Sequence, residues 1–489
     1  MRMERVTYRE QGAVQLEDFD LTLFAGEIVG MIPMNSHGLT ALINLLRHNL
    51  PIQAGYIYYR EEQINSWRLP HPRYNRIGVI QSESGLVEGL TVADNIFVLR
   101  PGFKTWYLRP SVFRRQLQPF LEQLGIHISA DAYVEELSTF QRFVVELVKA
   151  VVAGSRLIVL RDVSTFISES ELTQLQLILR YYAAQGVAFL YIGFHLEELE
   201  QICDRTAFLI NGRIAKVLRP NEVKSSGIDF CERKEWEAQV TQQSAEVSAA
   251  PPVLQVSHLT SGTMRDLTFA VSPGECLVLQ DLDNRIFGDL LAALQGKQSI
   301  EGGEVKLRGE PFLCAPTREI AILREQPADT MLFSEMSYFD NLFFTIDHRL
   351  PELWWSTRVQ EGIRRDANAI SGELFDLRIE QLTKTEKYDL VYHRIRLQNP
   401  AVLFCIQPFK GADVGLRKHI WGLLEGLMKR GIAVVILAVN LADALSLARH
   451  LIRIHKDAPD EVYEQRDFAN ATFNAPWLDI YRQEEARDR

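Results

Sequence analysis

The sequence has few cysteines and no long apolar run, and both absences narrow the classes of protein it can belong to. Its five cysteines lie far apart, without a CxxC pair: Cys203, Cys231, Cys276, Cys314 and Cys405. That spacing argues against a disulfide framework and a zinc ribbon, so we expect a protein of a reducing, cytoplasmic compartment. No stretch reaches the roughly 18 apolar residues of a membrane-spanning helix, and the first residues form no apolar leader.

An excess of basic charge is also missing. Lys and Arg number 53 against 63 Asp and Glu, which gives a net charge of −10 for 489 residues. Proteins that bind nucleic acids usually show the opposite balance, so we expect no nucleic-acid partner. Hydrophobic residues make up 47% and charged residues 24%, as in globular proteins, and the length favours more than one domain.

The sequence does contain a long internal repeat. Four segments recur in the same order, each 245 to 248 residues later: 26–29 as 274–277, 90–95 as 336–341, 137–138 as 382–383, and 186–190 as 431–435. We therefore expect two copies of one domain, at residues 1–239 and 253–455. A small, polar, proline-bearing linker would join them at 240–252, and a charged tail would follow at 456–489.

Each copy alternates short apolar runs with amphipathic segments. Runs such as Leu157–Leu160 and Val434–Ala438 are short, which suits buried parallel strands, and Arg109–Leu124 has the apolar spacing of a helix. Alternating strands and helices predict an α/β fold with a mostly parallel sheet and right-handed crossovers.

The first copy has the setting of a phosphate-binding loop, which is a strand, a loop and then a helix. Such a loop needs GxxxxGK[ST], because glycines expose backbone N–H groups, the lysine reaches the phosphates and the hydroxyl holds Mg²⁺. Gly38 and Thr40 fit this spacing, but Pro33 replaces the first glycine and Leu39 replaces the lysine. By itself this segment indicates no more than an ordinary strand–helix turn.

The equivalent loop of the second copy, Asp281–Asp289, departs further. Ile286 replaces the last glycine and Phe287 replaces the lysine. Three aspartates in this segment would repel an anionic ligand. We interpret it as a solvated loop that only connects a strand to a helix, with Arg285 as a partner of the carboxylates.

Further motifs follow in order, and with them the chain resembles the ATP-binding-cassette family over about residues 1–455. Gln81 stands at the Q-loop glutamine, and four segments resemble LTVxEN, LSGGQ, ISHRLEE and RGxDVG: Leu90–Asn95, Leu137–Gln141, Ile192–Leu199 and Lys410–Gly415. The resemblance is greatest to the tandem-cassette ATP-binding subunits of bacterial carbohydrate importers. It implies two tandem P-loop NTPase-like ABC ATPase domains, each with a mostly parallel sheet core, an antiparallel β subdomain and a helical subdomain.

The resemblance also implies where the catalytic residues should stand, and this chain departs from the family there. The Walker B aspartate is replaced by Arg161 and Ile406, the catalytic glutamate by Asp162 and Gln407, and the switch histidine by Phe194 and Val439. His195 comes one residue late, so its side chain should leave the opposite face of the strand end. In the signatures, Thr139-Phe140 and Lys384-Thr385 replace the paired glycines, and we expect their side chains to obstruct a phosphate.

In the family, each nucleotide site joins the P-loop of one cassette to the signature of the other. The residual ATP contacts implied here come from Gly38, Thr40, Gln81, Ser138 and Thr383. We expect weak or absent ATP binding, no Mg²⁺ and no useful hydrolysis, because losing the lysine, the metal anchor and the base together leaves little transition-state stabilisation.

Two side chains near this site keep alternatives open. Arg161 could hold an anion without metal, or it could form a salt bridge with Asp162 or a nearby carboxylate. Tyr8 could stack on an adenine, although we expect an exposed strand tyrosine.

Three functions stay open at this point. The leading hypothesis is a pseudo-ATPase that acts as a regulatory or structural partner of an ABC permease or of a signalling protein, peripheral to the inner face of the cell membrane. The second is a working ATP-binding subunit that energises carbohydrate import. The third is a soluble sensor that uses the old nucleotide cleft for another ligand. The two cassettes could pair within one chain or in a homodimer.

Overall fold

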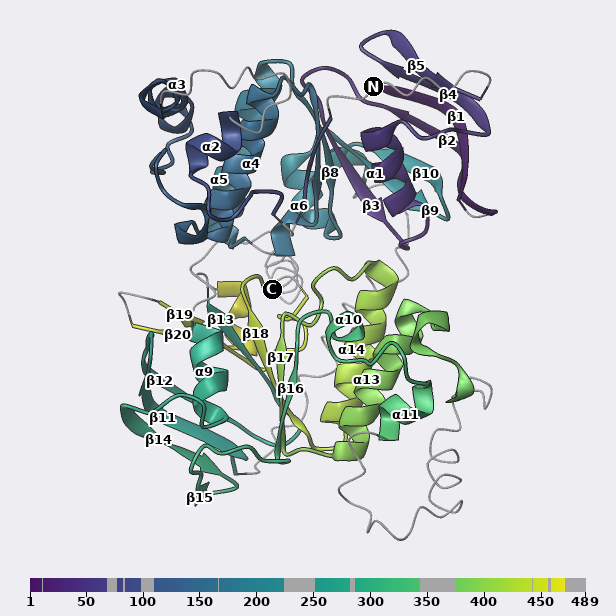
Figure 1. The fold of residues 1–489 in the computed structure, drawn as a ribbon. Helices are drawn as coiled ribbons and strands as arrows, with labels where there is room; N and C mark the ends of the chain where they lie inside the picture. The colour runs from purple at the N-terminus through teal and green to yellow at the C-terminus, as the bar shows by residue number, and fades with distance from the viewer. Residues whose placement is uncertain are drawn as a thin grey trace. The chain divides into compact units, whose positions relative to one another are not determined.

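The computed structural model describes residues 1–10, 12–67, 77–81, 84–97, 110–165, 167–223, 251–281, 286–343, 375–441, 443–455 and 459–470. The chain divides into two compact units, residues 1–237 with 469–489, and residues 238–468. Figure 1 colours the chain from the purple N-terminus to the yellow C-terminus. The expected linker at 240–252 lies almost entirely outside the described residues, so each unit is described by itself.

The first unit is built on a six-stranded sheet in the order β10-β9-β3-β8-β7-β6. All neighbours pair in parallel except β10, which runs antiparallel to β9. The strands are β3 (Ile28–Pro33), β6 (Ile77–Ile80), β7 (Leu157–Arg161), β8 (Ala188–Ile192), β9 (Arg205–Ile210) and β10 (Arg213–Leu218). Every residue of β3 and β8 is buried, as expected of a parallel sheet covered on both faces.

A four-stranded antiparallel sheet adjoins it in the order β2-β1-β4-β5. These strands are β1 (Arg2–Glu10), β2 (Ala13–Thr22), β4 (Ala54–Tyr59) and β5 (Glu62–Ser66). The first helix, α1 (Leu39–His48), shares one hydrophobic core with both sheets, because Leu42 packs in the same cluster as Phe19 of β2 and Val29 of β3. The P-loop segment therefore connects two layers of the unit.

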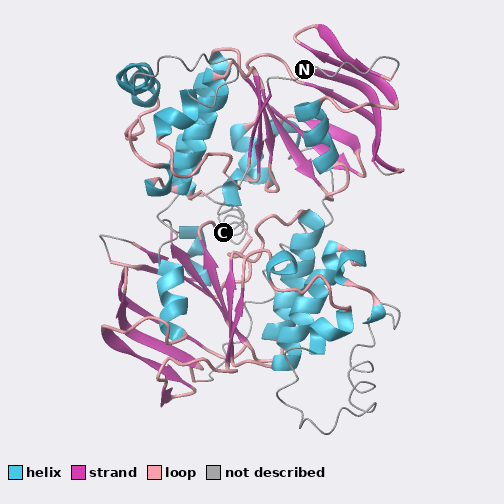
Figure 2. Cartoon of the chain, in the orientation of Figure 1, coloured by secondary structure: helices cyan, strands magenta, loops and turns pink. Residues whose placement is uncertain are grey.

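The remaining helices of the first unit include a group on the far side of the parallel sheet from the antiparallel strands (Figure 2). They are α2 (Val92–Phe97), α3 (Pro110–Gln123), η1 (Val134–Glu136), α4 (Thr139–Val152), η2 (Val163–Thr165), α5 (Glu169–Ala184), α6 (Leu196–Ile202) and α7 (Pro220–Val223). The helix predicted at 109–124 is confirmed as α3.

The second unit repeats this topology strand for strand. Its sheets have the orders β16-β17-β18-β13-β19-β20 and β12-β11-β14-β15. The strands are β11 (Leu254–Ser261), β12 (Met264–Val271), β13 (Cys276–Asp281), β14 (Gly302–Leu307), β15 (Glu310–Pro311), β16 (Ile320–Leu323), β17 (Val402–Ile406), β18 (Ala433–Ala438), β19 (His450–Ile454) and β20 (Glu461–Glu464). The predicted tandem α/β fold is thus confirmed.

The helices of the second unit follow the same order. They are α9 (Ile286–Leu294), α10 (Pro327–Thr330), α11 (Tyr338–Phe343), η6 (Ile379–Gln381), α13 (Lys384–Gln398), α14 (Val414–Met428) and η7 (Gln465–Asn470). The sheet of this unit reaches into the expected tail at 456–489, since β20 pairs with β19 and Phe468 is buried. Alternating charged residues in β20 conceal the strand in the sequence.

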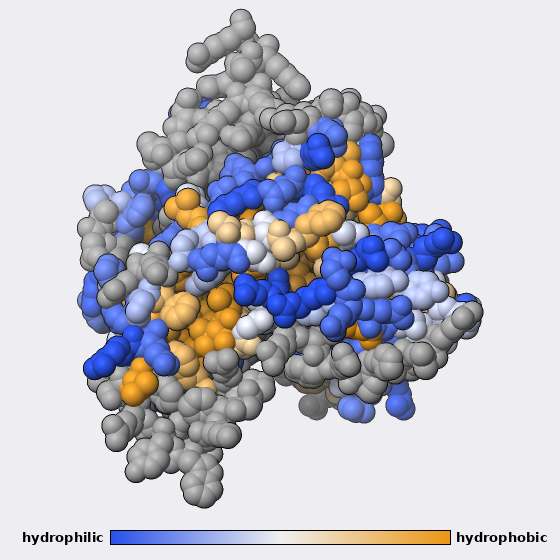
Figure 3. Space-filling view, turned by 90° about the horizontal axis from the view of Figure 1, so that it is seen from above, coloured by the Kyte–Doolittle hydropathy of each residue, from blue (hydrophilic) through white to orange (hydrophobic). Residues whose placement is uncertain are grey.

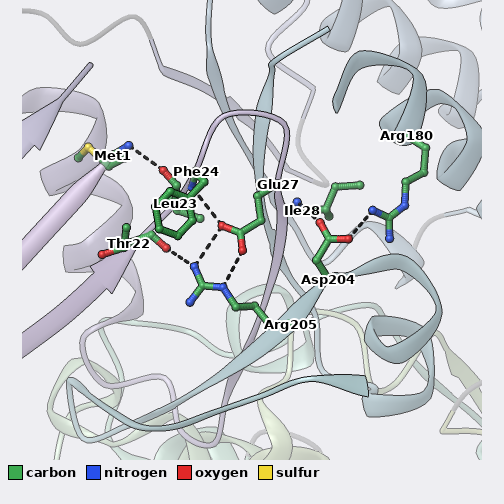
Figure 4. A network of polar contacts seen from close by, with 9 residues as sticks. All are labelled: Met1, Thr22, Leu23, Phe24, Glu27, Ile28, Arg180, Asp204 and Arg205. Atoms are coloured by element: carbon green, nitrogen blue, oxygen red, sulfur yellow. Dashed lines mark hydrogen bonds and ion pairs between the residues drawn. The ribbon is translucent and has the colours of Figure 1, made fainter. Parts of the chain in front are cut away.

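The Gly-Glu motif that begins the repeat is explained by an ion pair at the amino end of β3 (Figure 4). Arg205 Nε donates to Glu27 Oε1 at 2.7 Å, and the N–H of Phe24 donates to Glu27 Oε2 at 3.0 Å. The second unit has the same pair, with 3.0 Å between Arg449 Nη1 and Glu275 Oε1. The motif therefore serves the architecture of each cassette.

Asp204, the residue before Arg205, has a similar role in the first unit. Asp204 accepts a hydrogen bond from the N–H of Ile28 at 2.8 Å and pairs with Arg180 at 2.6 Å (Figure 4). Both contacts lie at the amino ends of the strands, away from the edge at which α/β proteins bind ligands.

The cysteines within the described residues are free thiols: Cys203, Cys276, Cys314 and Cys405. All four are buried, and burial raises the pKa of each thiol. They act as small apolar core residues.

Candidate functional site

The candidate site of the first unit lies at the carboxyl edge of its parallel sheet, where the loop after β3 leads into α1. Gly38 is the N-cap of α1 and has φ of 82°. A Cβ at this position would lie 2.5 Å from the carbonyl oxygen of Gln15 and 2.9 Å from Cα of Gly212. The glycine is therefore required by close backbone packing in this fold, whether or not a phosphate binds.

Asn35 ties the same loop to the turn between β9 and β10. Its Nδ2 donates to Asn211 Oδ1 at 2.8 Å, and the N–H of Asn211 donates to Asn35 Oδ1 at 3.3 Å. The N–H of Met34 donates to the carbonyl of Leu209 at 2.9 Å. Sequence reasoning missed this pair, and the only signal was the Asn211-Gly212 turn dipeptide.

The two positions of the missing lysines are core positions. Leu39 is 2% exposed and packs in the hydrophobic core of the first unit, and Phe287 is 3% exposed and packs in that of the second. In both copies the side chain at the position of the phosphate-binding lysine packs in the hydrophobic core. The apolar replacement therefore fills the core as well as removing a cation.

The other P-loop and Q-loop residues keep their places at the edge. Thr40 is exposed in the first turn of α1, and Gln81 is half-buried directly after β6. Because β3, β6 and β7 are parallel strands of one sheet, Gly38, Gln81 and Arg161 all lie at its carboxyl edge. Three of the sequence-predicted residues are thus brought to the same side of the first unit.

Arg161 ends β7 as a half-buried side chain. Among the described residues it has no hydrogen-bond or ion-pair partner, so the expected salt bridge with Asp162 is not formed there. In the second unit the same position is Ile406, which packs against the hydrophobic core. In neither unit is the last residue of this strand, where the family has its metal-binding aspartate, a carboxylate.

The next residue has strained backbone in both units. Asp162 has φ of 55° and Gln407 has φ of 41°, and both side chains are buried. The N–H of Asp162 donates to the carbonyl of Ile192 at the end of β8. The N–H of Gln407 donates to the carbonyl of Leu437 near the end of β18. A non-glycine residue with left-handed backbone costs about 1–3 kcal/mol, and such residues cluster at functional sites. The strained turn is therefore present in both units, although the catalytic glutamate of the family is replaced.

The switch-histidine positions also differ from the family. Phe194 is half-buried, and His195 stands at the N-cap of α6. Val439 is buried, and its carbonyl accepts a hydrogen bond from Gln280 Nε2 at 3.0 Å. Within the described residues, no cluster of three His, Cys, Asp or Glu side chains is arranged to hold a metal ion.

In the second P-loop, the carboxylate of Asp281 bonds the amino end of the following helix. Asp281 is 4% exposed, and its Oδ2 accepts a hydrogen bond from the N–H of Ile286, the first residue of α9, at 2.7 Å. An anion is thereby already placed at the helix N-terminus that a phosphate would use. The interpretation of this segment as a merely solvated loop is wrong for Asp281, whose partner N–H lies five residues further along the chain.

The carboxylate of Asp289 is also bonded within the second unit. Its carboxylate accepts hydrogen bonds from the side chain and the N–H of Thr263, in the turn between β11 and β12, and these bonds lower its pKa. Asp283 and Arg285 lie outside the described residues. In the described part of this loop, the carboxylates of Asp281 and Asp289 are both bonded within the unit and would repel a nucleotide phosphate.

Both signature residues are helix caps. Ser138 Oγ accepts a hydrogen bond from the N–H of Gln141 at 3.2 Å. Thr383 Oγ1 accepts one from the N–H of Glu386 and donates to its Oε2 at 2.8 Å. In the second unit a carboxylate thus lies at the amino end of α13, where it disfavours phosphate.

The bulky residues of the signatures are accommodated within each unit. Phe140 is buried, so it does not obstruct the helix start as expected from the sequence. Lys384 Nζ donates to the carbonyl of Gly411 at 3.0 Å. Thr139, Lys384 and Thr385 remain exposed at these positions.

The most specific motif of the second copy is used internally. Lys410 pairs with Glu325 at 2.7 Å, and Asp413 caps α14 by accepting from the N–H of Leu416 at 2.8 Å. Buried Arg417 donates to the carbonyl of Ala412. Each charged residue of this motif has an intramolecular partner.

Tyr8 does not form part of an exposed adenine platform. It is 7% exposed and packs in the core of the first unit. The expectation of an exposed strand tyrosine is therefore wrong.

The surface holds apolar residues in separate patches between polar ones on the face drawn in Figure 3. Phe24 and Leu177 are the most exposed large apolar side chains of the first unit's described part. Among the helices that the structure describes, none has the length and apolar character needed to cross a bilayer.

Comparison with known proteins agrees with the fold and the motifs. Residues 16–163 match the family model described as ABC transporter. The Ribose import ATP-binding protein RbsA of Geobacillus kaustophilus is 24% identical over 468 residues, which cover 92% of this chain and 94% of that protein. The Ribose import ATP-binding protein RbsA 1 of Rubrobacter xylanophilus is 25% identical over 491 residues, covering 96% and 98%.

A solved structure shares the fold over both units. The RNase-L Inhibitor superposes with a TM-score of 0.59 at 12% identity, covering 95% of this chain and 91% of that one. The topology, the ordered motifs and these relatives agree: the chain has two tandem ABC ATPase-like domains and is similar over most of its length to sugar-import ATP-binding subunits.

Proposed function

We propose that this chain is a tandem pseudo-ATPase that acts as a regulatory or structural partner of a carbohydrate-importer-like system. The observation that supports this is the burial of both lysine positions, Leu39 and Phe287, at 2% and 3% exposure. Phosphoryl transfer depends on cations placed around the γ-phosphate, and neither P-loop can supply one from this position.

Each half has a further obstacle of its own. In the first, Arg161 stands where a metal-binding carboxylate is needed. In the second, the carboxylate of Asp281 already bonds the helix N-terminus. Any residual nucleotide binding would be confined to the first unit, at Gly38, Thr40 and Gln81, with Arg161 supplying positive charge without Mg²⁺.

The partner follows from the relatives and from one retained element. The relatives are named as import ATP-binding proteins, and we propose that this chain engages an ABC permease at the inner face of the membrane through the segment near Gln81–Asn95. Asn95 is fully buried and holds Val87 with hydrogen bonds of 2.8 and 3.1 Å. Asn341 holds Phe333 in the same way, so this segment keeps its shape in both units.

The test is a calorimetric titration of the full chain with ATP, with and without Mg²⁺, together with a phosphate-release assay. We expect no Mg²⁺-dependent binding and no turnover, and the Arg161→Asp variant should gain neither. Micromolar, Mg²⁺-dependent binding with turnover that falls at least ten-fold in Thr40→Ala would support a working importer subunit instead.

The partner is tested separately. The permease subunits encoded nearest to this chain should retain it on purified membranes, and Val87→Asp should weaken that retention. Equal retention on membranes without the permease would contradict the proposed partner and leave the ATPase result intact.

A further inference from the structure

One cationic contact recurs in both cassettes. In the first unit Lys149, on α4, donates from Nζ to the carbonyl of Gly85 at 3.4 Å. In the second unit Arg394, on α13, donates from Nη1 to the carbonyl of Met331 at 2.7 Å. The two lysine and arginine positions are 245 residues apart and the two carbonyls 246, so this is one structural position seen twice.

In the first unit a buried carboxylate accompanies the cation. Glu146 lies one helical turn before Lys149, and its Oε1 accepts from Ser84 Oγ at 2.6 Å and from the N–H of Gly85. Burial raises the pKa of Glu146 and lowers the pKa of Lys149, while the two opposite charges stabilise each other. The cation of the first unit therefore has a carboxylate to oppose its charge.

In the second unit the carboxylate is lost and a cavity takes its place. Val391 stands at the position of Glu146, and a cavity of about 180 Å³ opens beside it. One side of the cavity is formed by Val391 and Arg394 from α13 and by Ile320 and Ile322 from the edge strand β16, and the amides of Gln295 and Gln398 also line it. All of these residues belong to one unit.

The arginine in this cavity has no counter-charge among the described residues. Its only hydrogen-bond partner there is the neutral carbonyl of Met331. Burial lowers the pKa of Arg394, and no carboxylate opposes that effect. A half-buried guanidinium without an anion is costly, and its planar N–H fork matches a carboxylate in a bidentate geometry.

We propose that this cavity is a binding site for a small carboxylate with a short aliphatic tail. The carboxylate pairs with Arg394, and the tail packs against Ile320, Ile322 and Val391. By volume alone, a cavity of about 150 Å³ accommodates benzene, so the space here suits a ligand of about six heavy atoms. The site is independent of the ATPase question, because it lies beside α13 and β16 and uses no P-loop residue.

The test uses butyrate as the probe and the uncharged 1-butanol as its matched control, on the full-length chain. Calorimetry and thermal unfolding should show that butyrate binds at millimolar concentration and raises the unfolding midpoint, and that 1-butanol does neither. Arg394→Gln should weaken butyrate binding at least ten-fold. Lys149→Gln, the same change in the first unit, should leave it unchanged.

A second variant protects the test against misfolding. Val391→Glu restores the carboxylate of the first unit, so it should abolish butyrate binding and should unfold at a higher temperature than Val391→Gln, which adds the same volume without charge. The proposal is overturned if butyrate does not bind the unmodified chain at 50-fold molar excess in the millimolar range, if 1-butanol binds equally well, or if Val391→Glu binds butyrate as before.

Discussion

The two cassettes share one topology, but paired residues near the carboxyl ends of two neighbouring parallel strands are apolar in the first unit and polar in the second. In the first unit, Ile32 of β3 lies opposite Phe208 of β9, and both are buried apolar residues. In the second unit, the matching positions on β13 and β19 are Gln280 and Arg453.

The polar pair of the second unit is buried and is hydrogen-bonded to a partly exposed glutamate. Arg453 Nε donates to Gln280 Oε1 at 2.8 Å, and its Nη1 pairs with Glu461 of β20 at 3.3 Å. Asp281, the residue after Gln280, accepts a hydrogen bond from the N–H of Ile286 at the start of α9. The first unit instead holds its loop by packing Gly38 against Gly212 and by the Asn35–Asn211 hydrogen bonds. One fold is therefore compatible with two ways of closing the same phosphate loop, neither of which needs a lysine.

The largest effect is expected from returning the lysine to the first unit. Leu39→Lys would place a charge in the core, so it should cost at least the roughly 2–5 kcal/mol of a Leu→Ala change and should not restore ATP binding. Urea denaturation and an ATP titration measure the two outcomes. Leu39→Met is the control and should cost under about 1.5 kcal/mol. A stable variant that binds ATP would show that the site lacks only its cation.

The next effect concerns the network of the second unit. Arg453→Leu removes the hydrogen-bond donor of buried Gln280 Oε1 and one partner of the partly exposed Glu461, so it should cost about 1–3 kcal/mol in urea denaturation. The double change Gln280→Ile with Arg453→Phe copies the first unit and should recover most of that loss, because apolar replacements of whole buried networks are often neutral. Equal destabilisation of the single and double variants would contradict the equivalence of the two strand ends.

A smaller effect is expected at the cap of α9. Asp281→Ala removes the side-chain acceptor of Ile286 and should cost about 1 kcal/mol, whereas Asp281→Asn keeps an acceptor and should cost a few tenths. Hydrogen exchange at the first turn of α9 reports the same difference locally. If both variants behave alike, the charge and not the hydrogen bond closes the loop.

The smallest effect depends on pH and belongs to the second unit. The hydrogen bond that His419 Nε2 donates to Asp389 Oδ1, at 2.6 Å, raises the pKa of His419 above its usual value of 6.5. Its stabilisation is therefore fully present below about pH 6.5 and is lost as the pH rises through the raised pKa. Since both side chains are one-third exposed, the effect should stay below about 1 kcal/mol.

Denaturation midpoints of the chain and of His419→Gln between pH 5 and pH 9 measure this effect. The first unit has Gln174 and Val144 at the equivalent positions, so its unfolding should lack this pH dependence. A pH dependence that survives in His419→Gln would assign it to other groups.

The repeat offsets were enough to predict two cassettes, because strands and helices depend on patterns that survive substitution. The roles of single residues were harder to predict. Asp281 and the N–H of Ile286 are close only after the turn between them has formed, so the sequence showed a carboxylate without its partner. Gln280 and Arg453 did leave a signal, since each follows a run of apolar residues in its strand. Leu39 was recognised as a lost lysine, but its place in the core required the packed structure.

The capped helix ends have a consequence for how such a scaffold would behave in a cell. In this family the amino ends of these helices meet the phosphates. Here the side-chain oxygens of Ser138, Thr383 and Asp281 accept hydrogen bonds from backbone N–H groups at these helix ends. The positive ends of the helices are then already balanced in the absence of a ligand. Under the proposed function, a partner held by this protein would be insulated from the energy charge of the cell, since the scaffold keeps the same shape whether ATP is scarce or plentiful.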